Sequence, residues 1–124
     1  MTDGPDLGAL VGCQVTRVCF DHQVTLLLAG AGHPERVDAS LVVESPMSLT
    51  AGGSTVRVDP DTATNLAAVL ALLHRRIASV DEAADGTLRL GFGGGDSLAV
   101  HPDPPYESWS LTGDGVPNRL AGPS

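Results

Sequence analysis

The chain has 124 residues, of which 42% are hydrophobic and only 3% are aromatic. A protein of this length can bury one hydrophobic core without disulfides or metals, and this core must be built mainly from Val, Leu and Ala. The formal net charge is −8, and the seven basic residues are all arginine. Because binding to nucleic acids and anionic membranes depends on basic side chains, both are disfavoured. In the simpler interpretation the acidity keeps the protein soluble, and in the other it suits cationic partners or the basic face of a protein partner.

The first residues are polar and acidic and contain no long apolar run. We therefore expect neither a signal peptide nor a transmembrane helix, and we expect a cytoplasmic location. Cys13 and Cys19 fall on one expected strand, roughly 20 Å apart at about 3.3 Å per residue. This separation is too long for a disulfide. Two reduced thiols are expected, and their spacing matches no zinc or redox motif.

Four strands are predicted in the N-terminal half. Runs rich in β-branched residues at 14–20 and 23–29 flank residues 21–22, which is typical of a hairpin with a tight turn. Residues 37–43 alternate between apolar and polar, which predicts a third strand with one buried face. Residues 47–50 supply a short fourth strand.

One helix is predicted over about 60–74. Asp59 is expected as its N-cap and Pro60 as its first residue, since both types favour these positions. Apolar side chains then recur at the spacing of one helical face: Leu66, Val69, Leu70 and Leu73. The pattern indicates a helix of about four turns that covers one side of a sheet.

Four more strands are predicted in the C-terminal half. Residues 77–83 and 87–92 form a hairpin, because Asp-Gly at 85–86 is a strong turn signal. A further strand begins at residue 98 and ends at a proline corner, since prolines lack the amide donor that a central strand needs. The last strand covers 106–112.

An internal repeat is indicated when the chain is compared with itself at a shift of 62 residues. Nine positions are identical between residues 11–53 and 73–115. The identical pairs are Val18/Val80, Thr25/Thr87, Leu26/Leu88, Leu28/Leu90, Gly32/Gly94, Ser48/Ser110, Leu49/Leu111, Thr50/Thr112 and Gly53/Gly115. Met47 is aligned with Trp109 at this shift. The strand predicted over 37–43 matches better at a shift of 61, which aligns Val37 with Leu98. Convergent hairpin patterning is the alternative to duplication.

The expected fold class is therefore α+β, as a single domain over 1–124. It is mainly antiparallel, with two pseudo-repeated four-strand units, about 11–53 and 73–115, joined by the helix at about 60–74. The ordered part covers about 9–113, with flexible tails at 1–8 and 114–124.

The stretch from Asp85 to Gly113 also carries a family pattern. It reads Asp-Gly-Thr-Leu-x-Leu-x-Phe, a Gly/Asp turn, Leu-x-Val-x-Pro-Asp, and then Tyr-Glu-x-Trp-x-Leu-x-Gly. Residues 11–21 add Val-Gly-x-x-Val-Thr-x-Val-Cys-x-Asp. Together these segments resemble a small uncharacterised family of high-GC bacteria with a C-terminal Tyr-Glu-x-Trp motif. The resemblance supports the limits of the domain and implies no mechanism.

The candidate binding residues are His101, Asp103, Tyr106, Glu107 and Trp109, around the proline corner. Two carboxylates, an imidazole and a phenol could form an acid–base or a cation site. The spacing matches no metal signature, however, and a strand would direct Tyr106 and Glu107 to opposite faces. A structural corner, with Trp109 in the core, is the competing interpretation.

No phosphate-binding loop and no nucleophile motif occurs in the sequence, so we predict no catalytic residue, metal or cofactor. The favoured function is a non-catalytic acidic protein-binding module, as an immunity-type or regulatory partner. A homodimer is compatible with this function. The alternative is a small-molecule-binding protein or an unrecognised enzyme with a pocket between the two β units.

Overall fold

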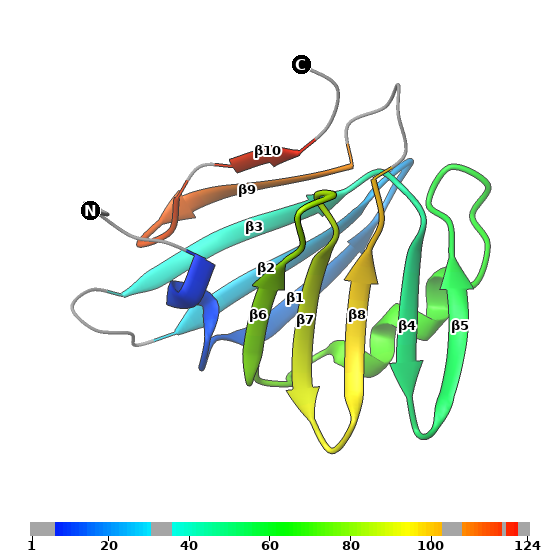
Figure 1. Ribbon diagram of the computed structural model, residues 1–124, viewed down its shortest axis with the longest axis horizontal. Coiled ribbons are helices and arrows are strands. Elements are labelled where there is room, and N and C mark those ends of the chain that lie inside the picture. The colour runs from blue at the N-terminus through cyan, green and yellow to red at the C-terminus, as the bar shows by residue number, and fades with distance from the viewer. Residues whose placement is uncertain (1–6, 31–35, 103–107, 118, 122–124) are drawn as a thin grey trace.

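The computed structural model describes residues 7–30, 36–102, 108–117 and 119–121, and within them ten strands form two antiparallel sheets (Figure 1). The strands of sheet A, in spatial order, are β1 (Gln14–Phe20), β2 (Val24–Gly30), β3 (Val37–Val43), β9 (Trp109–Asp114) and β10 (Arg119–Ala121). Those of sheet B are β5 (Ser54–Val58), β4 (Met47–Ala51), β8 (Asp96–Val100), β7 (Leu88–Gly93) and β6 (Ser79–Glu82). The prediction of a mainly antiparallel β-protein is confirmed.

Two tight turns follow directly from their residues. The Asp21 N–H donates to the Gln23 carbonyl at 2.9 Å and closes the β1–β2 hairpin. Gly52 and Gly53 connect β4 to β5 with φ angles of 62° and 83°. Both angles are left-handed, which is typical of the two-residue hairpin turn that favours glycine.

Each sheet combines strands from both halves of the chain. Sheet A contains the meander β1–β2–β3 and the later hairpin β9–β10, whereas sheet B contains the meander β6–β7–β8 and the earlier hairpin β4–β5. The chain crosses from one sheet to the other through residues 44–46 and again through residues 101–108. The two crossovers lie together, because the Glu44 N–H donates to the Ser108 carbonyl at 3.0 Å and the His101 N–H donates to the Pro46 carbonyl at 3.2 Å.

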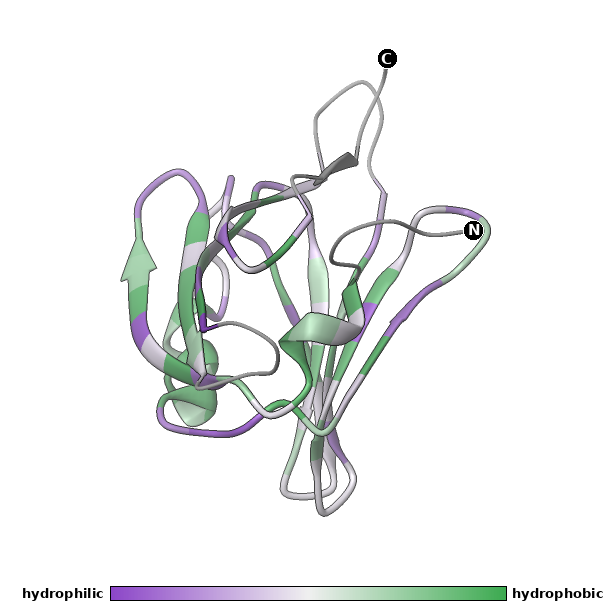
Figure 2. Cartoon of the chain, turned by 90° about the vertical axis from the view of Figure 1, so that its left-hand side faces the viewer, coloured by the Kyte–Doolittle hydropathy of each residue, from purple (hydrophilic) through white to green (hydrophobic). Residues whose placement is uncertain are grey.

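The core lies between the two sheets and is almost entirely aliphatic. Alternation along the strands directs every second side chain inward, as in β3, where Val37, Ala39, Leu41 and Val43 are buried. Trp109 is the largest fully buried side chain and is only 1% exposed. Figure 2 shows that hydrophobic stretches occupy strands of both sheets and the short helical segments.

The predicted helix over 60–74 is wrong in its type and its extent. The helical segment is a 3₁₀ helix, η2 (Leu66–Leu72). Ala63 and Asn65 have left-handed φ angles of 57° and 58°, which no continuous right-handed helix accommodates. The inward residues are Leu66, Val69 and Leu72, which recur every three positions as a 3₁₀ helix requires, whereas Leu70 is 50% exposed.

The predicted four-strand units and tails also need correction. Each half contributes five strands, because β5 and β10 follow the four that the sequence predicted. The predicted strand at 106–112 begins at Trp109 among the described residues. A second 3₁₀ helix, η1 (Leu7–Leu10), begins at the end of the predicted N-terminal tail, and β10 lies within the predicted C-terminal tail. Leu10 is fully buried, so apolar burial extends into the N-terminal segment.

The segment after η2 returns along the free side of β1. The Ile77 N–H donates to the Cys13 carbonyl at 2.8 Å, and the Val15 N–H donates to the Arg75 carbonyl at 2.9 Å. Gln14 and Arg76 are therefore paired as an isolated antiparallel bridge. This segment links the two halves at the edge of sheet A.

Replacement of Trp109 tests the core. We expect Trp109→Ala to lower the free energy of unfolding by about 3–5 kcal/mol, the usual range for truncation of a buried aromatic side chain. Urea unfolding measures it. Thr112→Ala, at an exposed position of the same strand, is the matched control and should change stability by about 0.5 kcal/mol or less. Equal stabilities of the two variants would contradict the buried position of the indole.

Candidate functional site

Trp109 is placed in the core and offers no surface to a partner. Its side chain is opposite Val43 in the β3–β9 ladder, and its indole Nε1–H donates to the Gly86 carbonyl at 3.2 Å. This hydrogen bond satisfies the one polar atom of a large apolar side chain. The bond also ties sheet A to the β6–β7 turn of the other sheet. Trp109 therefore acts as a structural link between the sheets.

His101 lies on the outer side of sheet B, directly after β8. Its side chain is exposed, and its Nε2 is 2.9 Å from the Ser48 hydroxyl oxygen on β4. Its backbone N–H is already used by the crossover at Pro46. The imidazole is thus oriented across two neighbouring strands and remains accessible to solvent.

The other three predicted binding residues, Asp103, Tyr106 and Glu107, lie outside the described residues. Of the predicted group, the structure therefore places only His101 and Trp109. The first is on an outer face and the second is in the core, so these two side chains do not form a common site.

A polar clamp around Arg75 is a feature that the sequence interpretation missed. The Arg75 Nη1 is 2.7 Å from the Asp96 Oδ2, and its Nη2 donates to the Phe92 carbonyl at 3.0 Å. The Gly52 N–H donates to the Asp96 Oδ1 at 3.2 Å. Arg75 therefore joins the segment after η2 to the turns at one end of sheet B. The sequence offered no signal for it, because its partners are distant along the chain.

The electrostatics of this clamp favour the ionised carboxylate. The hydrogen bond from Arg75 and then that from the Gly52 N–H hold the pKa of Asp96 below its ordinary value. The Asp96 side chain is 18% exposed and that of Arg75 is 34% exposed. Solvent therefore screens the pair, and its role is to fix geometry rather than to supply large stability.

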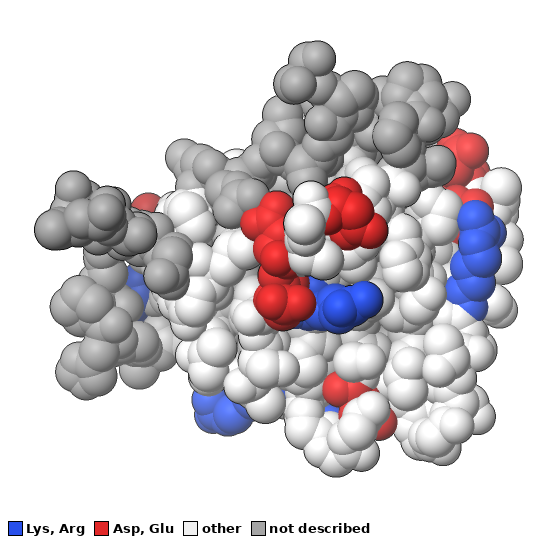
Figure 3. All heavy atoms as spheres, viewed as in Figure 1, with Lys and Arg blue, Asp and Glu red and all other residues white. Residues whose placement is uncertain are grey.

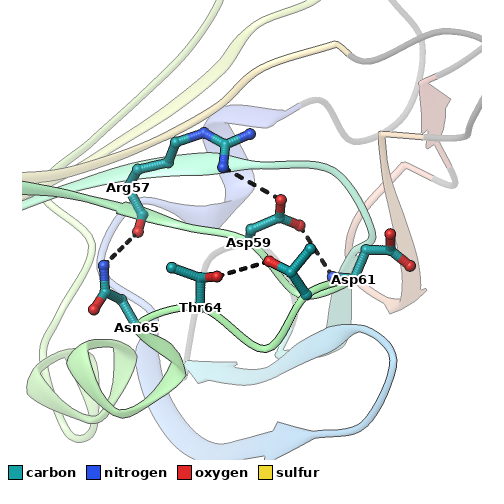
Figure 4. A network of polar contacts seen from close by, with 6 residues as sticks. Arg57, Asp59, Asp61, Thr64 and Asn65 are labelled. Atoms are coloured by element: carbon teal, nitrogen blue, oxygen red, sulfur yellow. Dashed lines mark hydrogen bonds and ion pairs between the residues drawn. The ribbon is translucent and has the colours of Figure 1, made fainter.

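A second polar network closes the loop between β5 and η2 (Figure 4). The Asp59 Oδ2 is 3.3 Å from Arg57 Nη1, and its Oδ1 accepts the Asp61 N–H at 3.1 Å. The Asn65 side-chain amide donates to the Arg57 carbonyl at 2.9 Å, and the Thr64 N–H donates to the Asp59 carbonyl at 3.0 Å. The two oxygens of the Asp59 carboxylate therefore accept hydrogen bonds from the end of β5 and from the loop. This arrangement is that of a structural turn.

Acidic side chains gather at the β6–β7 hairpin. Asp81 and Glu82 belong to β6 and Asp85 to the turn, while Arg89 faces Asp81 across the ladder. Figure 3 shows acidic side chains over this hairpin with basic atoms beside them. The Thr87 N–H, 2.9 Å from the Asp85 Oδ1, lowers the pKa of Asp85. The group presents negative charge to solvent at neutral pH.

The cysteines carry no redox chemistry together. Cys13 is buried and Cys19 is exposed, and both thiols are free. Burial raises the pKa of the Cys13 thiol, which disfavours the reactive thiolate. Among the described residues, no group of three or more His, Cys, Asp and Glu side chains could hold a metal ion. Every buried side-chain nitrogen or oxygen in the same part of the chain has a hydrogen-bond partner.

The fold and these polar groups define an antiparallel β-protein with two sheets, each of which contains strands from both halves of the chain. The chain belongs to the Family of unknown function (DUF6188), whose model matches residues 7–123. No curated protein and no solved structure matches it. A search of the described residues for a helix long and apolar enough to cross a membrane found none.

The clamp makes a prediction about acid stability. Because the folded pKa of Asp96 is lowered, its stabilising contribution is present above the unfolded pKa, about 3.9, and is lost as the pH falls through the folded value. We expect Asp96→Asn to be less stable than wild type at pH 6–7, and this difference to shrink below about pH 4. Thermal melts across pH measure it. Glu44→Gln, at an exposed crossover position, is the control. A stability difference between wild type and Asp96→Asn that is constant with pH would contradict the prediction.

Proposed function

We propose that this chain is a non-catalytic acidic protein-binding module that acts in the cytoplasm as an immunity-type or regulatory partner. The observation that carries the proposal is the acidic surface at the β6–β7 hairpin, where Asp81, Glu82 and Asp85 accompany a single arginine. The chain as a whole has 15 acidic residues and seven basic ones. Complementary charge speeds association and selects partners, so a partner with a basic face fits best.

The polar groups inside the fold support a surface function. The Arg75 clamp and the Asp59 loop are both occupied by hydrogen bonds that hold turns in place. The space between the sheets is filled by apolar side chains, including Trp109. No observation in the described part of the chain favours the alternative, a small molecule or substrate bound between the β units.

We also propose that the chain arose by internal duplication and that its Tyr-Glu-x-Trp segment is a family feature of high-GC bacteria. The return segment beside β1 supports duplication. At a shift of 62 residues, Val15 corresponds to Ile77 and Cys13 to Arg75. The Ile77 N–H donates to the Cys13 carbonyl at 2.8 Å, and in the same way the Val15 N–H donates to the Arg75 carbonyl at 2.9 Å. Gln14 corresponds to Arg76 at this shift, and the two residues are also paired with each other as an isolated bridge.

Side chains and dihedral angles repeat at the same shift. The Gln14 Nε2 donates to the His74 carbonyl at 3.1 Å, and the Arg76 Nη1 donates to the Gly12 carbonyl at 3.2 Å. Gly12 and His74 both have left-handed φ angles, 91° and 69°. These reciprocal contacts are those expected around a pseudo-twofold axis that passes between Gln14 and Arg76.

The ladders that join the two halves support the correspondence of Met47 with Trp109. Val43 faces Trp109 between β3 and β9, as Val100 faces Met47 between β8 and β4. Val43 of β3 therefore corresponds to Val100 of β8, which is a shift of 57. This correspondence takes the place of the match of Val37 with Leu98 at a shift of 61. The second crossover is accordingly longer than the first by five residues.

Comparison of the two halves in other family members tests duplication. We expect the paired positions to share apolar character, as Leu10 and Leu72 and as Val15 and Ile77 do here. For each family member, the similarity between its N-terminal and C-terminal halves is measured at shifts of 62 and 57. The same similarity in shuffled sequences is the control. Similarity no higher than in the shuffled sequences would favour convergent hairpin patterning instead.

Affinity purification of the tagged full-length chain from its native cell, with mass spectrometry, tests the binding function. We expect a protein with a basic surface that is retained at low salt and released at high salt, because exposed charges are screened. Asp81→Asn with Glu82→Gln should weaken retention, whereas Asp61→Asn, at an exposed position of the loop between β5 and η2, should not. Recovery of a small molecule without a protein partner would overturn the proposal.

A further inference from the structure

We propose that the outer face of sheet A is the docking surface for an amphipathic helix of the partner, with apolar side chains at its centre and Lys or Arg at one end. This inference rests on the proposed protein-binding function and adds a second contact surface for the same partner. It concerns a different part of the molecule from the acidic β6–β7 hairpin. The surface is defined by the outward side chains of β2, β3 and β9.

An apolar patch lies at the centre of this face, and it consists of Leu27, Ala29 and Val42. In β2 and β3 the buried positions alternate with partly exposed ones, and all three residues are partly exposed. Leu27 pairs with Ser40 and Thr25 with Val42, so Leu27 and Val42 are diagonal neighbours on one face. None of the three belongs to the hydrophobic core cluster or to the residues packed against it. The patch therefore points away from sheet B.

Sheet B supplies an internal comparison, since it has the same order of a meander followed by a hairpin. By ladder position, Leu27 opposite Ser40 in sheet A matches Gly91 opposite Ser97 in sheet B. Val42 likewise matches Ala99, so β2 and β7 are related at a shift of 64 and β3 and β8 at a shift of 57. Gly91 and Ala99 are neighbours of Ser97 on the outer face. Sheet B thus forms the same arrangement of strands with no large apolar side chain at these positions of its outer face. The fold does not require Leu27 and Val42 to be apolar.

Negative charge borders the patch on the side of β9, whereas the exposed Arg17 of β1 faces Leu27 on its other side. Asp38 and Asp114 are directly opposite in the β3–β9 ladder, and both are exposed. Asp38 is also opposite Ala29, so the pair adjoins the apolar patch. Like charges that face each other across a ladder are destabilising. Neither carboxylate takes part in an ion pair within the described residues.

These two observations together specify the partner. A cationic side chain between Asp38 and Asp114 would remove their repulsion, while Leu or a similar residue would cover Leu27 and Val42. A helix with one apolar stripe packs naturally on a sheet face. The charge complementarity selects a helix with a basic end, and it argues against a second copy of this acidic chain.

The test uses the ¹⁵N-labelled full-length protein and a synthetic amphipathic helical peptide with a Leu stripe and Lys at one end. We expect amide shifts to be largest in β2, β3 and β9. Leu27→Thr and Val42→Thr should each weaken peptide binding about tenfold, the loss typical of a residue near the centre of an interface. Asp38→Asn with Asp114→Asn should weaken binding and reduce its salt dependence. Thermal melts confirm that each variant is folded.

Ala99→Thr and Asp81→Asn, on the outer face of sheet B, are the matched controls and should leave the peptide affinity unchanged. Shifts confined to β6 and β7, or unchanged affinity of the Leu27 and Val42 variants, would overturn the choice of surface. The same variants in the native purification separate this inference from the proposed function. A protein partner whose retention does not depend on Leu27 or Val42 overturns the docking surface alone, whereas recovery of a small molecule without a protein overturns the function as well.

Discussion

The pairing of β3 with β9, and of β4 with β8, is the interaction on which the rest of the structure depends. Each pairing joins a strand of one half to a hairpin of the other. Without it, each half would have a meander and a detached hairpin, and their apolar faces would remain in water. The exchange produces two complete sheets, and burial of their facing aliphatic surfaces is the main source of stability. Trp109 and Met47 occupy matching places beside these junctions.

Local patterns predicted much of this fold and could not predict its assembly. Alternation in residues 37–43 and the turn residues at 85–86 indicated strands and a hairpin that the structure contains. Strand periodicity says which face is buried but not which strand is adjacent, so the exchange of hairpins was not predicted. The type of the helix was predicted wrongly because its apolar residues fit both a 3.6-residue and a three-residue repeat. Asn65 has a left-handed φ angle, so the helix begins only after it, at Leu66.

The candidate site was less predictable than the fold. Clustering along the sequence suggested that His101 and Trp109 act together, but a crossover between two sheets separates an outer position from the core. Conversely, Arg75 and Asp96 meet although 21 residues separate them. Leu27 and Val42 are apolar as core residues are, yet the burial patterns of β2 and β3 place both on the outer face, where they become neighbours. Side chains on a sheet form groups across strands, which a linear sequence does not display.

The exchange of hairpins has a consequence for the order of events during protein synthesis. The meander β1–β2–β3 is complete once residue 43 is made, but the partner of β3 begins only at Trp109. During most of translation, β3 therefore presents a bare edge and an uncovered apolar face, and both promote aggregation. The contacts that protect them join residues far apart in the chain, and such long-range pairing is slow. Sheet A therefore cannot be completed until nearly the whole chain has been made.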